Sequence, residues 1–175
     1  SGELLSLNKM LGSLQDAGNT VTLAGYINLL NESGLLCGLQ KFSIDNARRK
    51  ASIPKLQVYN NALKMVYNSL SFDQSLLDRK HWGRIFESGI GAYLVSQAFT
   101  HRFEVYYWRE RNDEVDFILR KNNSLIAIEV KSNAENNTSG LDKFRQNFNP
   151  NKAFIVGEGG ITPEEFLSMN IKKLF

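Results

Sequence analysis

Four charged side chains are the best candidates for chemistry in this sequence: Glu87, Asp116, Glu129 and Lys131. Glu129 and Lys131 alternate near the end of an otherwise apolar run, residues 125–132 (LIAIEVKS), so in a strand they point to the same side. Carboxylate oxygens are the ligands that Mg²⁺ prefers, and one or two carboxylates often suffice beside waters and a substrate phosphate. A nearby lysine can stabilise an attacking hydroxide or developing phosphoryl charge. The set therefore suits a divalent cation and a phosphate group.

A predicted hairpin brings two of these carboxylates together. Asn122 and Asn123 separate two β-rich runs, and asparagine tolerates the positive φ of a tight turn. If this turn pairs Lys121 with Ser124, one face of the hairpin is apolar, with the pairs Val115–Val130, Phe117–Ile128 and Leu119–Ile126. The other face then has Asp116 opposite Glu129, and Glu114 opposite Lys131.

This opposition of like charges needs a compensating group. Directly opposed like charges destabilise a sheet by up to about 1 kcal/mol when exposed, and by more as water is removed. A divalent cation between Asp116 and Glu129 would offset the repulsion. The alternative is a solvated sheet face, on which Lys131 pairs with Glu114 or also with Glu129, and Asp116 is only a solvated neighbour.

Glu87 adds a third carboxylate on a predicted helix. Residues 81–98 (HWGRIFESGIGAYLVSQA) have apolar side chains at helical spacing, and Glu87 lies at the edge of this stripe. Gly83 and Gly91 are its neighbours four residues away on either side, so they leave room for a sheet or a ligand to approach. The alternative is an exposed glutamate between glycines that merely permit close helix packing.

The elements around these residues predict an α/β fold. The helix at 81–98 precedes β-rich runs at 103–110, 114–121 and 125–132, a short helix at 140–148 and a buried strand at 152–157. Thr162 as N-cap, Pro163 in the first turn and Glu165 in the capping-box position predict a final helix.

The first half predicts a winged-helix-like α+β segment. A helix at about 3–16, a second helix capped by Thr22, strands at 35–44 and 55–60 and a helix at 61–69 follow one another. The turn between the strands contains Arg48, Arg49 and Lys50, which either contact nucleic-acid phosphates or form a solvated turn. We expect two domains, residues 1–75 and 76–175.

Composition excludes several function classes. The single cysteine, Cys37, excludes an internal disulfide framework and suits a reducing cytoplasm. No apolar run approaches the ~20 residues of a membrane span, so we expect a cytoplasmic protein without a membrane partner. A net charge of +3 makes no strong case for nucleic acid by itself, and the sequence has no P-loop for a nucleoside triphosphate.

The series Glu87, Asp116, Glu129-Val130-Lys131, on helix, strand and next strand, resembles the PD-(D/E)XK nuclease superfamily. That resemblance spans about residues 80–157 and implies a restriction-endonuclease-like αβββαβ core with a mixed sheet. Val115 stands where the motif has proline. The stretches LNKMLGSLQDAGNTVTLAGYINLLNESGLL, PKLQVYNNAL and EVDFIL…AIEVK further resemble the C-terminal portion of bacterial AAA+ ATPases, which has an uncharacterised domain.

The resemblance implies roles for individual residues. Asp116 and Glu129 would be metal ligands, Lys131 the catalytic lysine and Glu87 an auxiliary ligand. On the helix at 140–148, a second group would either contact a nucleic-acid backbone or form a solvated face: Lys143, Arg145 and Gln146. An ATPase module would precede Ser1, and only that module would bind ATP.

Two functions follow as alternatives. In the first, the chain is a nuclease-like domain that hydrolyses DNA phosphodiesters with Mg²⁺. In the second, the same fold is a non-cleaving module that binds nucleic acid or protein and regulates the ATPase.

Overall fold

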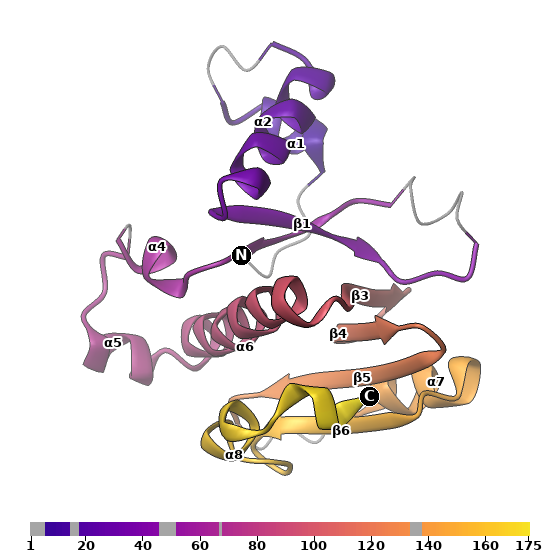
Figure 1. The fold of residues 1–175 in the computed structure, drawn as a ribbon. Helices are drawn as coiled ribbons and strands as arrows, with labels where there is room; N and C mark the ends of the chain where they lie inside the picture. The colour runs from indigo at the N-terminus through magenta and orange to yellow at the C-terminus, as the bar shows by residue number, and fades with distance from the viewer. Residues whose placement is uncertain (1–5, 15–17, 46–51, 67, 134–137) are drawn as a thin grey trace.

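The protein forms a mixed α/β fold around one six-stranded sheet (Figure 1). The computed structural model describes residues 6–14, 18–45, 52–66, 68–133 and 138–175. The strand order is β2-β1-β3-β4-β5-β6, and the bounds are β1 (Leu36–Lys41), β2 (Lys55–Val58), β3 (Glu104–Glu110), β4 (Asp113–Lys121), β5 (Ser124–Lys131) and β6 (Lys152–Gly157). The predicted α/β class is therefore confirmed.

The sheet is mixed because hairpins and crossovers alternate along it. β3, β4 and β5 form an antiparallel meander, and β1 pairs antiparallel with β2. β6 pairs parallel with β5 after the crossover through α7 (Ser139–Phe148), while β1 pairs parallel with β3. The first half of the chain thus extends the sheet of the second half.

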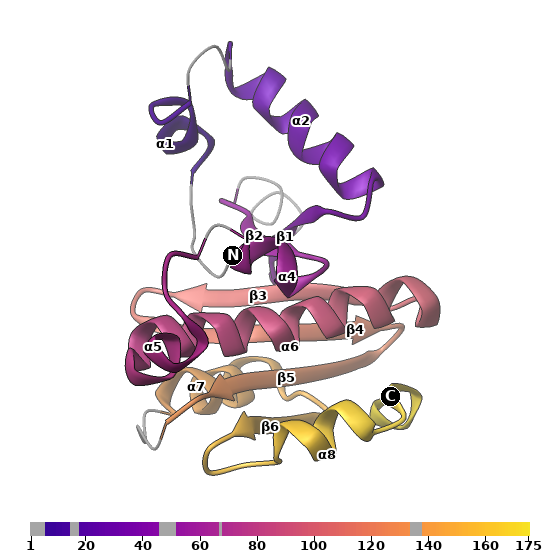
Figure 2. The same cartoon turned by 90° about the vertical axis from the view of Figure 1, so that its left-hand side faces the viewer.

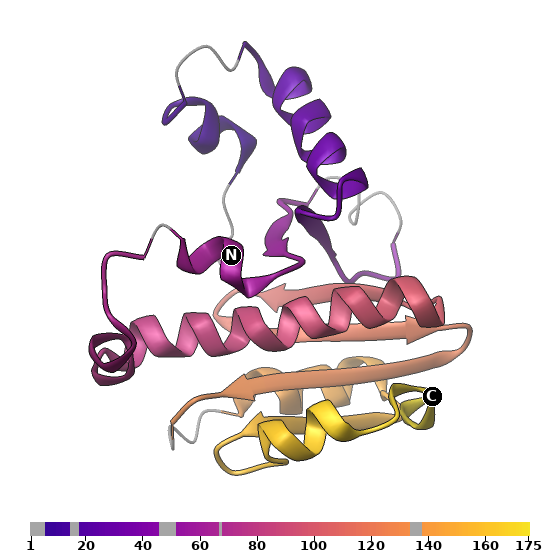
Figure 3. The ribbon, with the colours of Figure 1, turned by 60° about the vertical axis from the view of Figure 1, so that its left-hand side comes forward.

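Helices cover both faces of the sheet (Figures 2 and 3). α6 (Arg79–His101) and α8 (Pro163–Ser168) lie on one face and α7 on the other. The α6-side core includes Leu94, Phe117, Leu119, Ile126, Ile128 and Phe166. The α7-side core includes Phe42, Trp108, Val115, Ile118, Ala127 and Phe144.

Helix ends follow local sequence signals. The Thr162 side chain accepts a hydrogen bond from the Glu165 N–H at 3.1 Å, which confirms the predicted N-cap of α8. α6 begins after Asp78, whose carboxylate accepts from the His81 N–H at 3.0 Å. A 3₁₀ helix, η1 (Ile171–Leu174), follows α8. Among the helices of the described residues, none combines the length and apolarity needed to cross a membrane.

The first half agrees with the sequence prediction in order but differs in detail. α1 (Leu7–Leu11) is shorter than predicted within the described residues, and α4 ends early, at Asn61–Met65. α2 (Thr20–Glu32) is capped by Asn19 rather than Thr22, because the Asn19 carboxamide oxygen accepts from two N–H groups of the first turn. An additional helix, α5 (Phe72–Leu77), begins with a capping box.

The hairpin of β4 and β5 has the predicted register near its turn. Lys121 pairs with Ser124, and the ladder continues to Phe117 and Ile128. Beyond that point three predicted pairs are absent from the ladder, so these predictions are wrong: Val115 with Val130, Asp116 with Glu129, and Glu114 with Lys131. Here the Oδ2 atom of Asp116 accepts a hydrogen bond from the Val130 N–H at 2.8 Å. The Val130 N–H of β5 is thus bonded to the Asp116 carboxylate and not to a backbone carbonyl of β4.

Candidate functional site

A register shift in the sheet turns Asp116 toward α6. Between the pairs Tyr106–Ile118 and Trp108–Val115, β4 has one more residue than β3. Such a bulge interrupts the alternation of faces. Val115 consequently packs in the α7-side core, whereas Phe117 belongs to the α6-side core. The prediction that Val115 and Phe117 share a face is therefore wrong, because the bulge lies between them.

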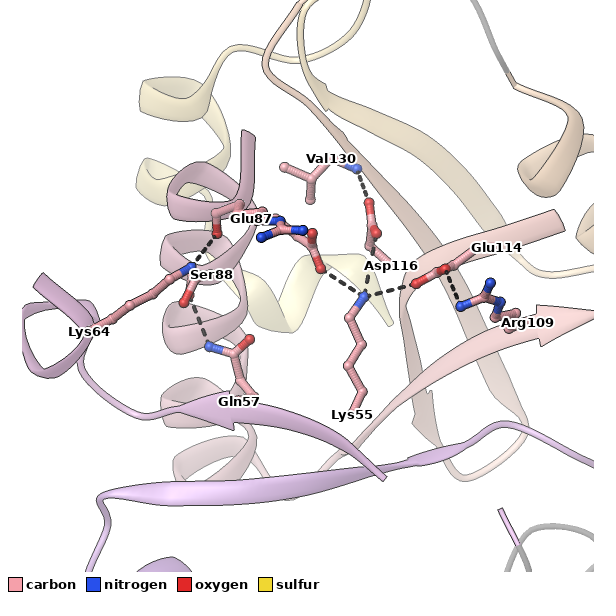
Figure 4. A network of polar contacts seen from close by, with 10 residues as sticks. Lys55, Gln57, Lys64, Glu87, Ser88, Arg109, Glu114, Asp116 and Val130 are labelled. Atoms are coloured by element: carbon pink, nitrogen blue, oxygen red, sulfur yellow. Dashed lines mark hydrogen bonds and ion pairs between the residues drawn. The ribbon is translucent and has the colours of Figure 1, made fainter. Parts of the chain in front are cut away.

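Lys55 of β2 is the centre of the site (Figure 4). Its Nζ atom lies 2.7 Å from Oε1 of Glu87, 3.2 Å from Oε1 of Glu114 and 3.5 Å from Oδ1 of Asp116. The Lys55 side chain is 1% exposed. Helix α6 thus supplies one carboxylate, β4 supplies two, and a strand from the first half supplies the ammonium among them.

Neighbouring polar contacts fix β2 against α6. Gln57, two residues after Lys55 and equally buried, donates a hydrogen bond from Nε2 to the Ser88 carbonyl oxygen at 3.0 Å (Figure 4). Gly91 makes this approach possible, since a Cβ atom there would collide with the Gln57 carboxamide and lie 2.8 Å from Cζ of Phe117. The glycine predicted to leave room beside Glu87 therefore admits a strand and a core side chain.

Glu129 and Lys131 form the second part of the site. The Lys131 Nζ atom lies 3.4 Å from Oε1 of Glu129, and both side chains are largely buried. Oε2 of Glu129 is buried without a hydrogen-bond partner among the described residues. Glu114 pairs with Lys55 and with Arg109. Of the alternative predicted for Lys131, the pair with Glu129 is therefore formed and the pair with Glu114 is not.

The crowded carboxylates have altered acidities. Burial, followed by the charge of Asp116, raises the pKa of Glu129 to about 8, although Lys131 opposes this shift. Burial and the charge of Asp116 also raise the pKa of Glu87 to about 7, against the opposing effect of Lys55. Burial disfavours the Lys55 charge, but the charges of Asp116, Glu87 and Glu114 outweigh it and raise the Lys55 pKa above its ordinary value. The cluster thus resists holding all its negative charges at once.

The donor set suits a cation held by two carboxylates. Among the described residues, no group of three or more His, Cys, Asp and Glu side chains is arranged to hold a metal ion. The buried, unpartnered Oε2 of Glu129 is nevertheless an available hard ligand, and Asp116 is close enough for its charge to act on Glu129. Mg²⁺ commonly uses only one or two protein carboxylates. The residues therefore fit a divalent cation between Asp116 and Glu129.

The structure brings together the four residues of the predicted chemical set. The sequence did not predict Lys55 as a member of this set. Nothing in residues 55–58 (KLQV) indicates that Lys55 lies among three carboxylates or that Gln57 contacts a helix. The only local signal is the alternation in β2, where Lys55 and Gln57 are buried and Leu56 and Val58 are partly exposed.

The α7 residues predicted for nucleic acid make contacts of their own, apart from this cluster. Lys143 on α7 pairs with Asp113 at 2.9 Å and with Glu110 at 3.4 Å. Arg145 pairs with Asp142 and donates to the Ala153 carbonyl oxygen, and Gln146 is exposed. Arg48, Arg49 and Lys50 lie outside the described residues.

Comparison with known proteins identifies one similarity. Residues 82–166, just under half of the chain, match the sequence model of a family described as a domain of unknown function (DUF4143). The matched part contains Glu87, Asp116, Glu129 and Lys131 but not Lys55. Comparisons with curated proteins and with solved structures gave no match.

Proposed function

We propose that this chain is a nuclease-like domain that hydrolyses DNA phosphodiesters with a divalent cation at Asp116 and Glu129. The observation that most supports this function is the unpartnered Oε2 atom of Glu129, buried beside the charges of Asp116 and Lys131. A buried carboxylate oxygen without a donor is costly unless a proton or a cation satisfies it. Mg²⁺ or Mn²⁺ would satisfy it and make the site chemically active.

Each residue of the set has a distinct role in this proposal. When bound, the divalent cation would supply Lewis-acid activation of a water and of a phosphoryl oxygen. Asp116 and Glu129 hold that cation, and the Val130 N–H fixes the Asp116 carboxylate through its 2.8 Å hydrogen bond. Lys131, 3.4 Å from Glu129, stabilises negative charge that develops on the phosphate. Glu87, whose Oε1 atom lies 2.7 Å from the Lys55 Nζ atom, is an auxiliary ligand that acts through a water and not directly on the cation.

The order of the elements supports a restriction-endonuclease-like core. α6, the meander of β3, β4 and β5, the crossover helix α7 and β6 follow the αβββαβ order. We further propose that the chain works as the C-terminal part of an AAA+ ATPase, with the helices and strands before α6 as a winged-helix-like segment. DNA and the ATPase module are the proposed partners, and the cytoplasm is the proposed location.

A second candidate function is a non-cleaving module that binds nucleic acid or protein for the ATPase. It is favoured by the Lys55 ammonium, which already neutralises the carboxylates of α6 and β4. In this alternative the charged cluster joins the two halves of the chain, and Asp116 has no catalytic task.

Thermal unfolding with and without millimolar Mg²⁺ or Mn²⁺ tests the proposed site, because a ligand that binds only the native state raises its stability. We expect the cation to raise the Tm of wild type but not that of Asp116→Asn. The asparagine oxygen can still accept the Val130 hydrogen bond, so this variant should keep its fold. Cleavage of plasmid and single-stranded DNA by the same two proteins then tests the reaction.

The two functions predict different outcomes. A cation-dependent Tm shift and DNA cleavage that are both lost in Asp116→Asn would support the nuclease. Equal cleavage by the wild type and the variant would contradict the roles proposed here. If neither cleavage nor a shift occurs while Asp116→Asn is more stable than wild type, the non-cleaving module is the better description.

A further inference from the structure

We propose that Lys55 is a fixed internal counter-ion that keeps divalent cations away from Glu87 and Glu114 and so confines them to Asp116 and Glu129. This inference rests on the proposed function, because it specifies how cations are distributed over the same site. It also assigns a role in the site to the first half of the chain.

Three carboxylates surround the Lys55 ammonium: Glu114 accepts a hydrogen bond from it, and Glu87 and Asp116 are ion-pair partners. An ammonium has three N–H donors, and three carboxylates lie 2.7, 3.2 and 3.5 Å from the Lys55 Nζ atom. Figure 4 shows the Lys55 side chain extending from β2 into the space between Glu87, Glu114 and Asp116. Three carboxylates around one point are also ligands that a hard divalent cation prefers. The ammonium therefore lies where these carboxylates would otherwise attract such a cation.

The backbone holds Lys55 in this position. Lys55 pairs with Leu39 in the β1–β2 ladder. Gln57, two residues further along β2, donates a hydrogen bond to the Ser88 carbonyl oxygen. Burial leaves the ammonium no route to solvent without movement of β2. A cation entering the α6 side would meet a fixed positive charge a few ångström away, and this repulsion is strong in partly buried surroundings.

Charge balance distinguishes the two sides of the cluster. Lys55 offsets the carboxylates of Glu87 and Glu114, and Arg109 lies 3.7 Å from the second oxygen of Glu114. The ammonium lies farther from Asp116, 3.5 Å from its Oδ1 atom, and the other oxygen of Asp116 accepts from the Val130 N–H of β5. The Glu129 side has the Lys131 ammonium on Oε1 but no partner on Oε2 among the described residues. A divalent cation is thus favoured beside Glu129 and opposed beside Glu87.

The test is direct measurement of Mn²⁺ binding by titration calorimetry and by electron paramagnetic resonance of free Mn²⁺. The main variant is the double change Lys55→Gln and Glu114→Gln, which removes one positive and one negative charge together. Glu114 is outside the proposed metal ligands, so Glu87, Asp116 and Glu129 all remain. Removing Lys55 alone would take the shared ammonium away from Glu87, Glu114 and Asp116 and endanger the fold.

Two matched controls accompany the double variant. Glu114→Gln alone keeps the ammonium and removes a negative charge that acts on Glu129, so it should bind Mn²⁺ no more tightly than the wild type does. The double change Lys143→Gln and Asp113→Asn removes another lysine–carboxylate pair, 2.9 Å apart on α7 and β4, and should also leave Mn²⁺ binding unchanged. Circular dichroism and Tm confirm that all variants are folded.

We expect the Lys55 double variant to bind Mn²⁺ at least about tenfold more tightly than wild type, or to gain a second bound ion. A folded double variant with wild-type affinity and stoichiometry would overturn the inference. If that variant does not fold, Lys55→Arg is the decisive protein: with its charge retained it should bind as wild type does, and tighter Mn²⁺ binding would overturn the inference.

The outcomes separate this inference from the proposed function. Wild-type Mn²⁺ binding that Asp116→Asn abolishes, with no gain in the double variant, overturns the role of Lys55 and leaves the nuclease intact. Binding by the double variant alone supports the exclusion of cations by Lys55 but overturns both their confinement to Asp116 and Glu129 and the proposed metal site of the wild type. No binding by either protein overturns both.

Discussion

At the scale of single residues, the cluster has more negative than positive charge. Four carboxylates (Glu87, Glu114, Asp116 and Glu129) are paired with three cations (Lys55, Arg109 and Lys131). Because several of these groups are buried, the uncompensated charge is costly, and a proton or a metal ion relieves it. Glu129 is the residue at which this relief is most directly measurable.

We expect Glu129→Gln to be more stable than wild type in metal-free buffer, by an amount that grows as the pH rises from about 5 to about 8. In the native chain the pKa of Glu129 is about 8, so the carboxyl group keeps its proton up to about that pH. In the unfolded chain the pKa has its ordinary value of 4.5, so the proton is lost at lower pH. Native stability therefore falls as pH rises through this window, by at most about 1.4 kcal/mol for each pH unit. Glutamine removes that loss, and urea unfolding at several pH values in EDTA measures it.

The control for this pH dependence is Glu158→Gln, which changes the same charge at an exposed position between β6 and α8. Its stability difference from wild type should stay nearly constant over the same pH range. A constant difference for Glu129→Gln as well would show that Glu129 ionises normally in the native chain.

At the scale of secondary-structure elements, the site depends on how closely α6 approaches the sheet. The bulge in β4 turns Asp116 toward α6, and Gly91 lets Gln57 and Phe117 pack against the helix backbone. Both features are needed for Glu87 and Asp116 to share Lys55. A larger residue at 91 should therefore disturb the core and the site together.

Gly91→Ala should lower the free energy of unfolding by roughly 1–3 kcal/mol, because its methyl group would collide with Gln57 and Phe117. Gly89→Ala in the same helix is the matched control, since the nearest atom to its added carbon is Nδ2 of Asn61 at 3.7 Å. That control should gain up to about 1 kcal/mol from helix propensity. Urea unfolding of both variants measures the difference, and equal effects would contradict the tight α6 packing.

At the scale of the whole molecule, the two halves of the chain share one sheet and contribute to the cores on both of its faces. Cys37 and Leu39 of β1 belong to the α6-side core, and Phe42 belongs to the α7-side core. Lys55 and Gln57 of β2 add polar contacts to α6 and β4. The predicted division at residue 75 therefore separates residues that are packed together.

A fragment of residues 76–175 should be much less stable than the full chain. It would expose the edge of β3 that pairs with β1 and leave Glu87 and Asp116 without Lys55. A fragment of residues 18–175, which keeps all six strands, is the control and should retain a cooperative transition. Circular dichroism melts compare them, and equal stability of the two fragments would support an independent domain at 76–175.

Some of this fold could be predicted because its signals are local. The Asn122–Asn123 turn set the register of β4 and β5 as far as Phe117 and Ile128, and Thr162 marked the start of α8. The faces of β4 were predicted incorrectly beyond that point. An alternating pattern assumes an uninterrupted strand, and the bulge arises from pairing with β3, which the β4 sequence does not encode by itself.

The sequence alone determined the order of the elements and the chemical types available: carboxylates on a helix and two strands, and a lysine two residues after Glu129. Backbone preferences and side-chain periodicity act over a few residues, so they can be recognised without the fold. Only the tertiary structure decided that Lys55, 59 residues before Glu114, lies among three carboxylates. That contact depends on how β2 packs against α6 and β4, since the free energy of a buried charge is set by its surroundings in space.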